Sequence, residues 1–175
     1  TLDCTQTHII VLEGLFGKVN KVTTTKELID KDTLANLKIK CLVLKHKEED
    51  CKQVKDLKYS DEIQYIVSHK TRNDFISRLC DKLSGNTLCL YQLVEKHGVI
   101  LYDLMKDFDR KVFFIHGGTD TETREKIRAI TEKETNAIIV ASYGTFSTGI
   151  NIRNLHNVVF ALSLIHISEP TRQIV

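Results

Sequence analysis

The second half of the chain alternates short apolar runs with longer segments whose apolar residues recur at helical spacing. The apolar runs predict β-strands over residues 87–91, 111–115, 136–141 and 157–161. The helical spacing predicts helices over residues 98–108 and 120–133, the second with Ile127 and Ile130 facing the core. Strands alternating with helices of this length are typical of βαβ units. We therefore expect an α/β fold built on a mainly parallel sheet.

The first half of the chain is less regular. Residues 8–12 (HIIVL) predict a strand, and the capping-box pattern that begins at Thr24 predicts a short helix ending at Asp30. Residues 37–46 alternate at first and then become continuously apolar, which indicates a strand entering a core. A charged, solvated loop is expected next. Helices are then expected over residues 60–68 and 71–84.

A loop rich in hydroxyl groups and glycine follows the strand predicted at 136–141. It holds Ser142, Thr145, Thr148 and Gly149, and a further apolar run begins at Val158. Open α/β sheets bind ligands at the carboxyl ends of their strands. Free backbone N–H groups and hydroxyls there suit phosphate, on a nucleotide or along a nucleic-acid backbone. A plain turn, in which Ser, Thr and Gly are common for conformational reasons, is the alternative.

Two stretches of the sequence carry a family resemblance. Residues 138–151, IIVASYGTFSTGIN, resemble motif V of the superfamily-2 helicases, and residues 111–127, KVFFIHGGTDTETREKI, resemble the strand, His-Gly turn and helix that precede it. Within that group the ordered series is similar to the UvsW-type phage DNA helicases. The resemblance runs from about Thr1 to Ala161. It implies a RecA-like fold, a mainly parallel sheet with helices on both faces.

The resemblance also implies roles for residues of the loop at 142–151. Ser142 takes the place of the hydroxyl residue that contacts a nucleic-acid phosphate, and Thr145 and Thr148 are expected to add hydrogen bonds. Gly149 supplies the tight turn. Asn151 stands where the family usually has Asp, near the nucleotide ribose, so an acceptor is kept but its charge is lost.

Two further loops are expected to hold a nucleic-acid strand. Gly117 allows the backbone to approach a phosphate, and Arg124, in the first turn of the next helix, can make a charge-assisted contact with one. Gln92 and His97 follow the strand at 87–91, in a region that resembles motif IV. The alternatives are an exposed Arg124 paired with a neighbouring glutamate and a His97 that is only a turn residue.

The resemblance divides the chain into three parts. Residues 1–36 are expected to be the tail of a first RecA-like, ATP-binding domain with its linker, and residues 37–161 the second RecA-like domain. Residues 162–172, LSLIHISEPTR, match the translation of a DNA adapter used in transposase-based sequencing libraries. We therefore expect residues 162–175 to be a non-native tail rather than a natural strand and loop.

The expected function is that of an ATP-dependent DNA helicase, in which this part grips single-stranded or branched DNA and forms one wall of the ATP cleft. The sequence contains no G-x-x-x-x-G-K-[ST] and no D-E-x-[HD] stretch, and motif VI is missing. ATP and Mg²⁺ would therefore need the first RecA-like domain of the same polypeptide, and this chain alone is expected to be inactive. The alternatives are a non-catalytic nucleic-acid-binding module and an unrelated α/β nucleotide- or sugar-binding domain.

Composition adds little to this picture. The 175 residues include 42% hydrophobic and 27% charged residues, and the net charge of +2 is too small to indicate nucleic-acid binding by itself. No apolar run is long enough to predict a membrane span. The five cysteines form no C-x-x-C pair. We expect reduced thiols, buried in the case of Cys41, Cys80 and Cys89, and a cytoplasmic setting, that of the bacterial host if the protein is phage-encoded.

Overall fold

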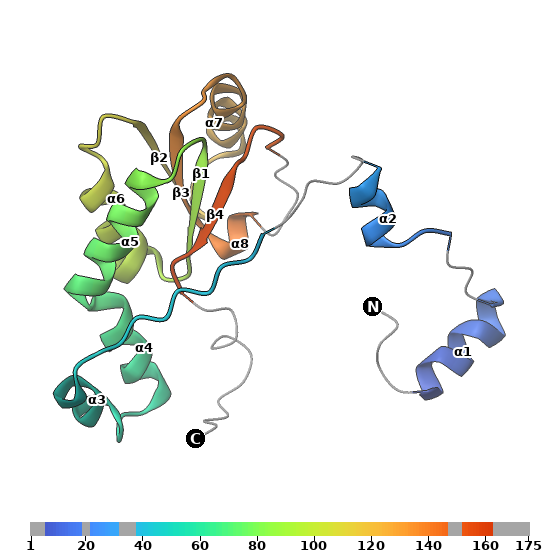
Figure 1. Ribbon diagram of the computed structural model, residues 1–175, viewed down its shortest axis with the longest axis horizontal. Coiled ribbons are helices and arrows are strands. Elements are labelled where there is room, and N and C mark those ends of the chain that lie inside the picture. Colours follow the sequence, from blue (N-terminus) through green and yellow to red (C-terminus); the bar gives the residue numbers. More distant parts are fainter. Residues whose placement is uncertain (1–5, 19–21, 32–37, 147–151, 163–175) are drawn as a thin grey trace. The chain divides into compact units, whose positions relative to one another are not determined.

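The computed structural model describes residues 6–18, 22–31, 38–146 and 152–162 (Figure 1). The chain divides into two compact units, Thr1–Val43 and Leu44–Val175. In the first unit, α1 spans Gln6–Phe16 and α2 spans Thr25–Asp30. The helix predicted to end at Asp30 is confirmed, and both capping-box hydrogen bonds between Thr24 and Glu27 are present at 3.2 Å.

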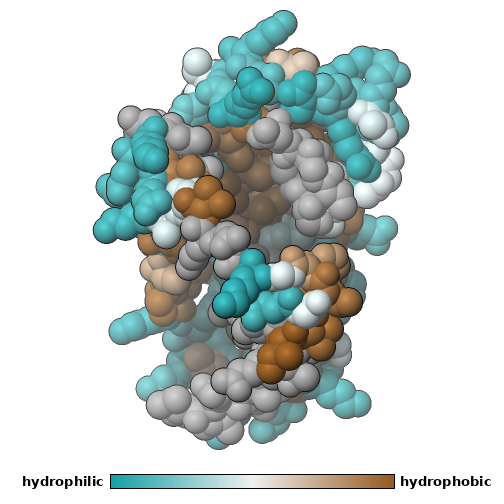
Figure 2. Space-filling model, turned by 90° about the vertical axis from the view of Figure 1, so that its right-hand side faces the viewer, coloured by the Kyte–Doolittle hydropathy of each residue, from teal (hydrophilic) through white to brown (hydrophobic). Residues whose placement is uncertain are grey.

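The strand predicted at residues 8–12 is wrong, because this run lies inside α1. A short apolar run fits a strand and a helix equally well, so its pattern could not separate them. Figure 2 shows brown, apolar side chains at the molecular surface beside teal, hydrophilic ones. The exposed apolar residues of α1 are Ile10, Val11, Leu12, Leu15 and Phe16 among its described side chains.

The second unit is built on a four-stranded sheet in which every pairing is parallel. The strands are β1 (Thr87–Tyr91), β2 (Lys111–Ile115), β3 (Ala137–Ser142) and β4 (Asn157–Phe160), in the order β2-β3-β1-β4. All four predicted strands are confirmed to within one residue at each end. The parallel sheet follows from the predicted alternation of strands and helices, and the expected α/β class is confirmed.

Helices lie between and beside these strands. They are α3 (Glu48–Val54), α4 (Tyr59–Ser68), α5 (Lys70–Lys82), the π-helix η1 (Val94–Gly98), α6 (Val99–Met105), α7 (Thr121–Lys133) and the short α8 (Tyr143–Phe146). Asp120 begins α7 by accepting a hydrogen bond from the Thr123 backbone N–H at 2.8 Å. No helix within the described ranges is long and apolar enough to cross a membrane.

Alternate residues of β1, β2 and β3 face two separate apolar clusters. On one face, Cys89 and Val140 pack with residues of α5 and α6 such as Ile76 and Leu101. On the other face, Leu88, Leu90 and Ile139 pack with Ile127 of α7. The sheet therefore has helices on both faces, as a RecA-like fold requires. Ile130 was also predicted to face the core, but its side chain is 39% exposed.

The segment before α3 contradicts two predictions. Residues 38–47 form no strand, and Ile39 and Val43 are 83% and 84% exposed. Their alternating pattern had no neighbouring strand among the described residues with which to pair. The charged stretch that follows is helix α3 instead of a loop. Cys80 and Cys89 are buried as predicted, whereas Cys41 is exposed.

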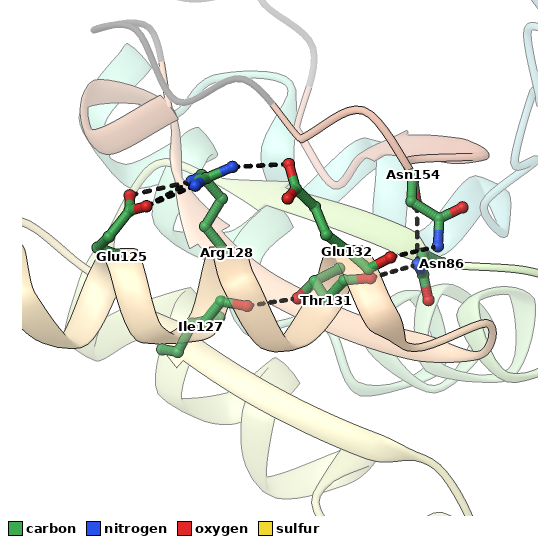
Figure 3. A network of polar contacts seen from close by, with 7 residues as sticks. All are labelled: Asn86, Glu125, Ile127, Arg128, Thr131, Glu132 and Asn154. Carbon is green, nitrogen blue, oxygen red and sulfur yellow. Dashed lines mark hydrogen bonds and ion pairs between the residues drawn. The ribbon is translucent and has the colours of Figure 1, made fainter.

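A buried amide ties the amino-terminal ends of the strands to the carboxyl end of α7 (Figure 3). Asn86, directly before β1, is only 1% exposed. Its Nδ2 donates to the carbonyl oxygens of Thr131, Glu134 and Asn154 at 2.7–2.9 Å. Its Oδ1 accepts from the Ala137 N–H at 2.8 Å. One side chain thus links the starts of β1 and β3, the end of α7 and the segment before β4.

Arg110 caps the carboxyl end of α5. Its Nη1 donates to the carbonyl oxygens of Cys80 at 2.6 Å and Leu83 at 2.9 Å, and its Nη2 donates to that of Gly85 at 2.8 Å. The last carbonyls of a helix have no partner within the helix. The positive charge also lies where the helix dipole favours it.

Replacing Arg110 by methionine is expected to lower the free energy of unfolding by about 1–2 kcal/mol, because charged hydrogen bonds are lost at a partly exposed site. Urea unfolding followed by circular dichroism measures the change. Arg78→Met, at an exposed position of α5, is the matched control and should change stability by less than about 0.5 kcal/mol. Equal effects of the two substitutions would show that the cap contributes nothing.

Candidate functional site

The carboxyl ends of the four strands meet at one edge of the sheet, because the strands are parallel. The registers align Ile115 of β2 with Ala141 of β3, and Ser142 of β3 with Tyr91 of β1. The residues that leave these strands are therefore neighbours along the edge (Figure 1). In sheet order they are the turn at 116–119, Ser142 with α8, Gln92, and the end of β4.

The turn after β2 is closed by its own side chains. The His116 N–H donates to Thr119 Oγ1, and the Gly118 N–H donates to His116 Nδ1, both at 3.1 Å. Gly117 is exposed, and its carbonyl accepts a hydrogen bond from Arg124 Nη2 at 3.0 Å. Arg124 Nε is buried without a partner among the described residues. The structure thus brings Gly117 and Arg124, both predicted to contact nucleic-acid phosphate, into direct contact with each other.

Ser142 and Thr145 also lie together, but they are less open than expected. Ser142 is the last residue of β3 and is 8% exposed, while Thr145 lies in α8 and is 4% exposed. Their hydroxyl oxygens are 2.7 Å apart and share a hydrogen bond. Three other residues predicted for this loop, Thr148, Gly149 and Asn151, lie outside the described residues.

Two side chains hold the end of β4 in place, and no sequence motif indicates that they act together. Arg72, in the first turn of α5, donates through Nη2 to the Ala161 carbonyl. Tyr143 donates through its hydroxyl to the Leu162 carbonyl, and its ring stacks on Phe160 at 6.1 Å. Burial raises the pKa of Tyr143 to about 12. The hydroxyl therefore stays protonated and remains a donor at neutral pH.

Arg72 carries a positive charge that is only partly satisfied. Burial lowers the pKa of its guanidinium, yet arginine keeps its charge in proteins. Its Nη1 is buried without a hydrogen-bond partner among the described residues. A buried donor of this kind attracts an anionic acceptor. No sequence motif marks Arg72, because its site is assembled from α5, α8 and β4.

His97 and Gln92 follow β1 and differ in exposure. Gln92 is exposed, whereas the His97 side chain is fully buried in η1. Neither ring nitrogen of His97 has a described partner, and its pKa falls to about 4 through burial first and then the nearby charge of Arg72. A contact between His97 and a nucleic-acid strand would therefore require the residues around it to move.

The close packing of η1 on β1 explains this burial. A Cβ atom at Gly98 would come within 2.5 Å of the Tyr91 ring, so the absence of a side chain permits the contact. Tyr91 is itself fully buried, and its hydroxyl donates to the Ile115 carbonyl at 3.1 Å. The segment after β1 is thereby fixed to the sheet, while Gln92, Glu95 and Lys96 are its exposed polar residues.

Comparison with known proteins identifies a relative whose sequence matches most of this chain. No family model matches the chain. The ATP-dependent DNA helicase uvsW of Enterobacteria phage T4 is 37% identical over 157 residues, which are 88% of this chain and 31% of the helicase. The crystal structure of T4 UvsW is similar with a TM-score of 0.60 and 36% identity, over 69% of this chain and 26% of that one. The chain thus spans about a third of the length of this relative.

Proposed function

Because this chain corresponds in sequence and fold to one segment of a UvsW-like helicase, we propose that it works as part of an ATP-dependent DNA helicase or translocase. The observation that carries the proposal is the extended sequence match, which includes the edge of the sheet where the candidate residues gather. In this role the second unit grips the nucleic-acid backbone and forms one wall of an ATP cleft. It would act in the cytoplasm of a bacterial host.

The proposed grip uses groups that recognise phosphate and ignore base identity. Arg124 and the exposed backbone at Gly117 lie at one end of the edge, and Gln92 lies nearer the other. Contacts to phosphate fix a protein on a strand without reading its sequence. A motor that moves along DNA needs this property, since it must not stop at particular bases.

We propose that the loop at 142–151 completes both the DNA-binding surface and the wall of the ATP cleft. Ser142, Thr145 and Thr148 would bind backbone phosphate, while Gly149 and Asn151 would lie against the nucleotide. The hydroxyl pair of Ser142 and Thr145 supports the assignment to phosphate, because either hydroxyl can exchange its present hydrogen-bond partner for a phosphate oxygen. Thr148, Gly149 and Asn151 are proposed on the sequence resemblance.

The catalytic groups are proposed to lie on another lobe of the same polypeptide. Phosphoryl transfer needs a lysine-containing phosphate loop and acidic ligands for Mg²⁺, and the sequence has neither motif. We propose that residues 1–36 are the end of that first RecA-like domain and that residues 37–161 belong to the second. ATP and Mg²⁺ would bind between the two, so this chain alone would not hydrolyse ATP.

Replacing Arg124 by alanine is expected to weaken the binding of single-stranded DNA by about fivefold to tenfold, the effect of losing one charged contact of roughly 1 kcal/mol. Fluorescence anisotropy with a labelled oligonucleotide measures the affinity of the 175-residue chain. Affinity should fall as salt rises, with a logarithmic slope of about −0.7 for each phosphate neutralised, and the slope of the variant should be shallower.

Lys126→Ala is the matched control for this experiment. Lys126 lies on the same helix, is exposed, and pairs with Glu122 at 2.7 Å. The Lys126→Ala substitution removes the same unit of charge but should reduce the affinity for single-stranded DNA less than Arg124→Ala does. Equal losses would indicate general electrostatic attraction and would count against a defined contact at the glycine turn. No salt-dependent DNA binding at all would favour an unrelated nucleotide- or sugar-binding domain.

A further inference from the structure

Three side chains with metal-binding atoms converge within the second unit, near the start of α3 and the junction of α4 and α5. His46 precedes α3, Asp50 lies in the first turn of α3, and His69 lies between α4 and α5. One ring nitrogen of each histidine and one carboxylate oxygen of Asp50 all lie within 4.8 Å of one another. The proposed DNA and nucleotide contacts use none of these three residues.

The surrounding contacts orient two of the three side chains. The His46 and His69 rings meet edge to face, with their centroids 4.9 Å apart, and the Tyr65 ring also contacts His69, with a centroid distance of 5.8 Å.

We propose that His46, Asp50 and His69 bind a zinc ion. Imidazole nitrogen and carboxylate oxygen are ordinary zinc ligands, and two histidines with one carboxylate leave the fourth tetrahedral position for water. Ligand atoms around tetrahedral zinc are about 3.3 Å apart, since each lies about 2.0–2.1 Å from the metal. Small rotations of the exposed His46 and the half-buried Asp50 and His69 can reach this spacing.

One hydrogen bond must change when the metal binds. His69 Nδ1 accepts from the Arg72 N–H at 3.3 Å and caps the start of α5. Zinc needs a lone pair on one nitrogen of this ring. If Nδ1 is the ligand, its lone pair is used directly. If Nε2 is the ligand, Nδ1 carries the proton and ceases to accept. The ion thus replaces a long, weak cap.

The bound ion would join two parts of the second unit that are distant in sequence. His46 and Asp50 belong to the start of α3, whereas His69 belongs to the junction of α4 and α5, and no element contact between α3 and that junction is extensive. The ion is therefore proposed to tie the start of α3 to the junction of α4 and α5. Zinc should stabilise the folded chain, because the unfolded chain does not hold the three ligands together.

Titration of the metal-free 175-residue chain tests this inference. Calorimetry with Zn²⁺ should show one ion bound per chain, and Zn²⁺ should raise the midpoint of thermal unfolding. Co²⁺, which shares the geometry of zinc but absorbs visible light, should give the spectrum of a four-coordinate site with nitrogen and oxygen ligands. A chain that binds no ion at one equivalent, or that is not stabilised by it, overturns the proposal.

Two single substitutions localise the site. Asp50→Asn removes the charged ligand, and His69→Asn removes a nitrogen ligand while it keeps a residue that caps helices well. Both should weaken zinc binding by more than about a hundredfold, beyond the effect of losing a supporting residue. Glu49→Gln removes a neighbouring charge and should leave binding nearly unchanged.

A thiol is the main competing ligand. Cys51 is exposed and adjacent to Asp50, and Cys41 is also exposed. Cys51→Ser should therefore bind zinc as the unmodified chain does. Loss of binding in Cys51→Ser, or unchanged binding in both Asp50→Asn and His69→Asn, would overturn the assignment of the three ligands. All the substituted side chains are exposed or half-buried, so the variants are expected to fold. The same thermal measurement, made without zinc, checks this.

Discussion

Replacing Asn86 by alanine is expected to lower the free energy of unfolding by about 4 kcal/mol, the largest effect of any single substitution considered. The amide is 1% exposed and makes four hydrogen bonds to three separate segments of the backbone. Alanine would leave the Ala137 N–H and the Thr131 and Asn154 carbonyls buried without that partner. Each unsatisfied buried group costs about 1–3 kcal/mol, and water entering the space would recover part of this.

Urea unfolding measures this loss, and Asn154→Ala provides a comparison. Asn154 Nδ2 donates to the carbonyls of Glu132 at 3.2 Å and Glu134 at 2.7 Å. Glu134 keeps its bond from Asn86 when Asn154 is truncated, so we expect a loss of only about 1 kcal/mol. A loss in Asn86→Ala no larger than that in Asn154→Ala would contradict the central role of Asn86.

Acidification from pH 7.5 to pH 5 is expected to lower the stability of the second unit by about 2 kcal/mol through His97 alone. The ring is fully buried beside Arg72, so its pKa falls to about 4 in the folded chain. The unfolded chain has a histidine pKa of about 6.5 and takes up its proton first as the pH falls. The contribution of His97 to the free energy of unfolding is therefore fully present above about pH 6.5. It decreases as the pH falls from about 6.5 to about 4 and does not change further below that.

His97→Leu isolates this contribution. The substitution removes the titrating group and two buried nitrogens that have no described partner, so little stability should be lost at pH 7.5. Unfolding free energies measured at several pH values should then decline less steeply for the variant. Relative to the unmodified chain, the variant should be about 2 kcal/mol more stable at pH 5 than at pH 7.5. Parallel curves for the two proteins would mean that His97 is not kept neutral by the fold.

The sheet could be predicted because each of its strands has a local apolar pattern that is enough to identify it as a strand. Residues 87–91 and 137–142 are apolar on both faces, as strands buried between two helical layers must be. The capping box at Thr24 is equally local, since all of its hydrogen bonds fall within four residues. The turn at Gly117 and the nearby Arg124 were predictable for the same reason, because they are close in sequence.

Other features could not be predicted because they depend on distant partners. Residues 8–12 and 37–46 looked like strands, but a strand exists only where another backbone pairs with it. Arg72 lies 89 residues from the carbonyl that it binds. The zinc ligands proposed at His46 and His69 are equally hard to see, since nothing in their spacing matches a metal motif.

The sequence by itself determined the parallel α/β sheet, the order of its helices and the polar loops at its carboxyl edge, because periodicity and capping act over a few residues. Only the tertiary structure decided which polar groups are buried. It placed His97 inside the core, paired the Ser142 and Thr145 hydroxyls, and left one arm of Arg72 without a described acceptor. Burial and charge pairing are properties of the assembled layers, and the order of residues along the chain does not contain them directly.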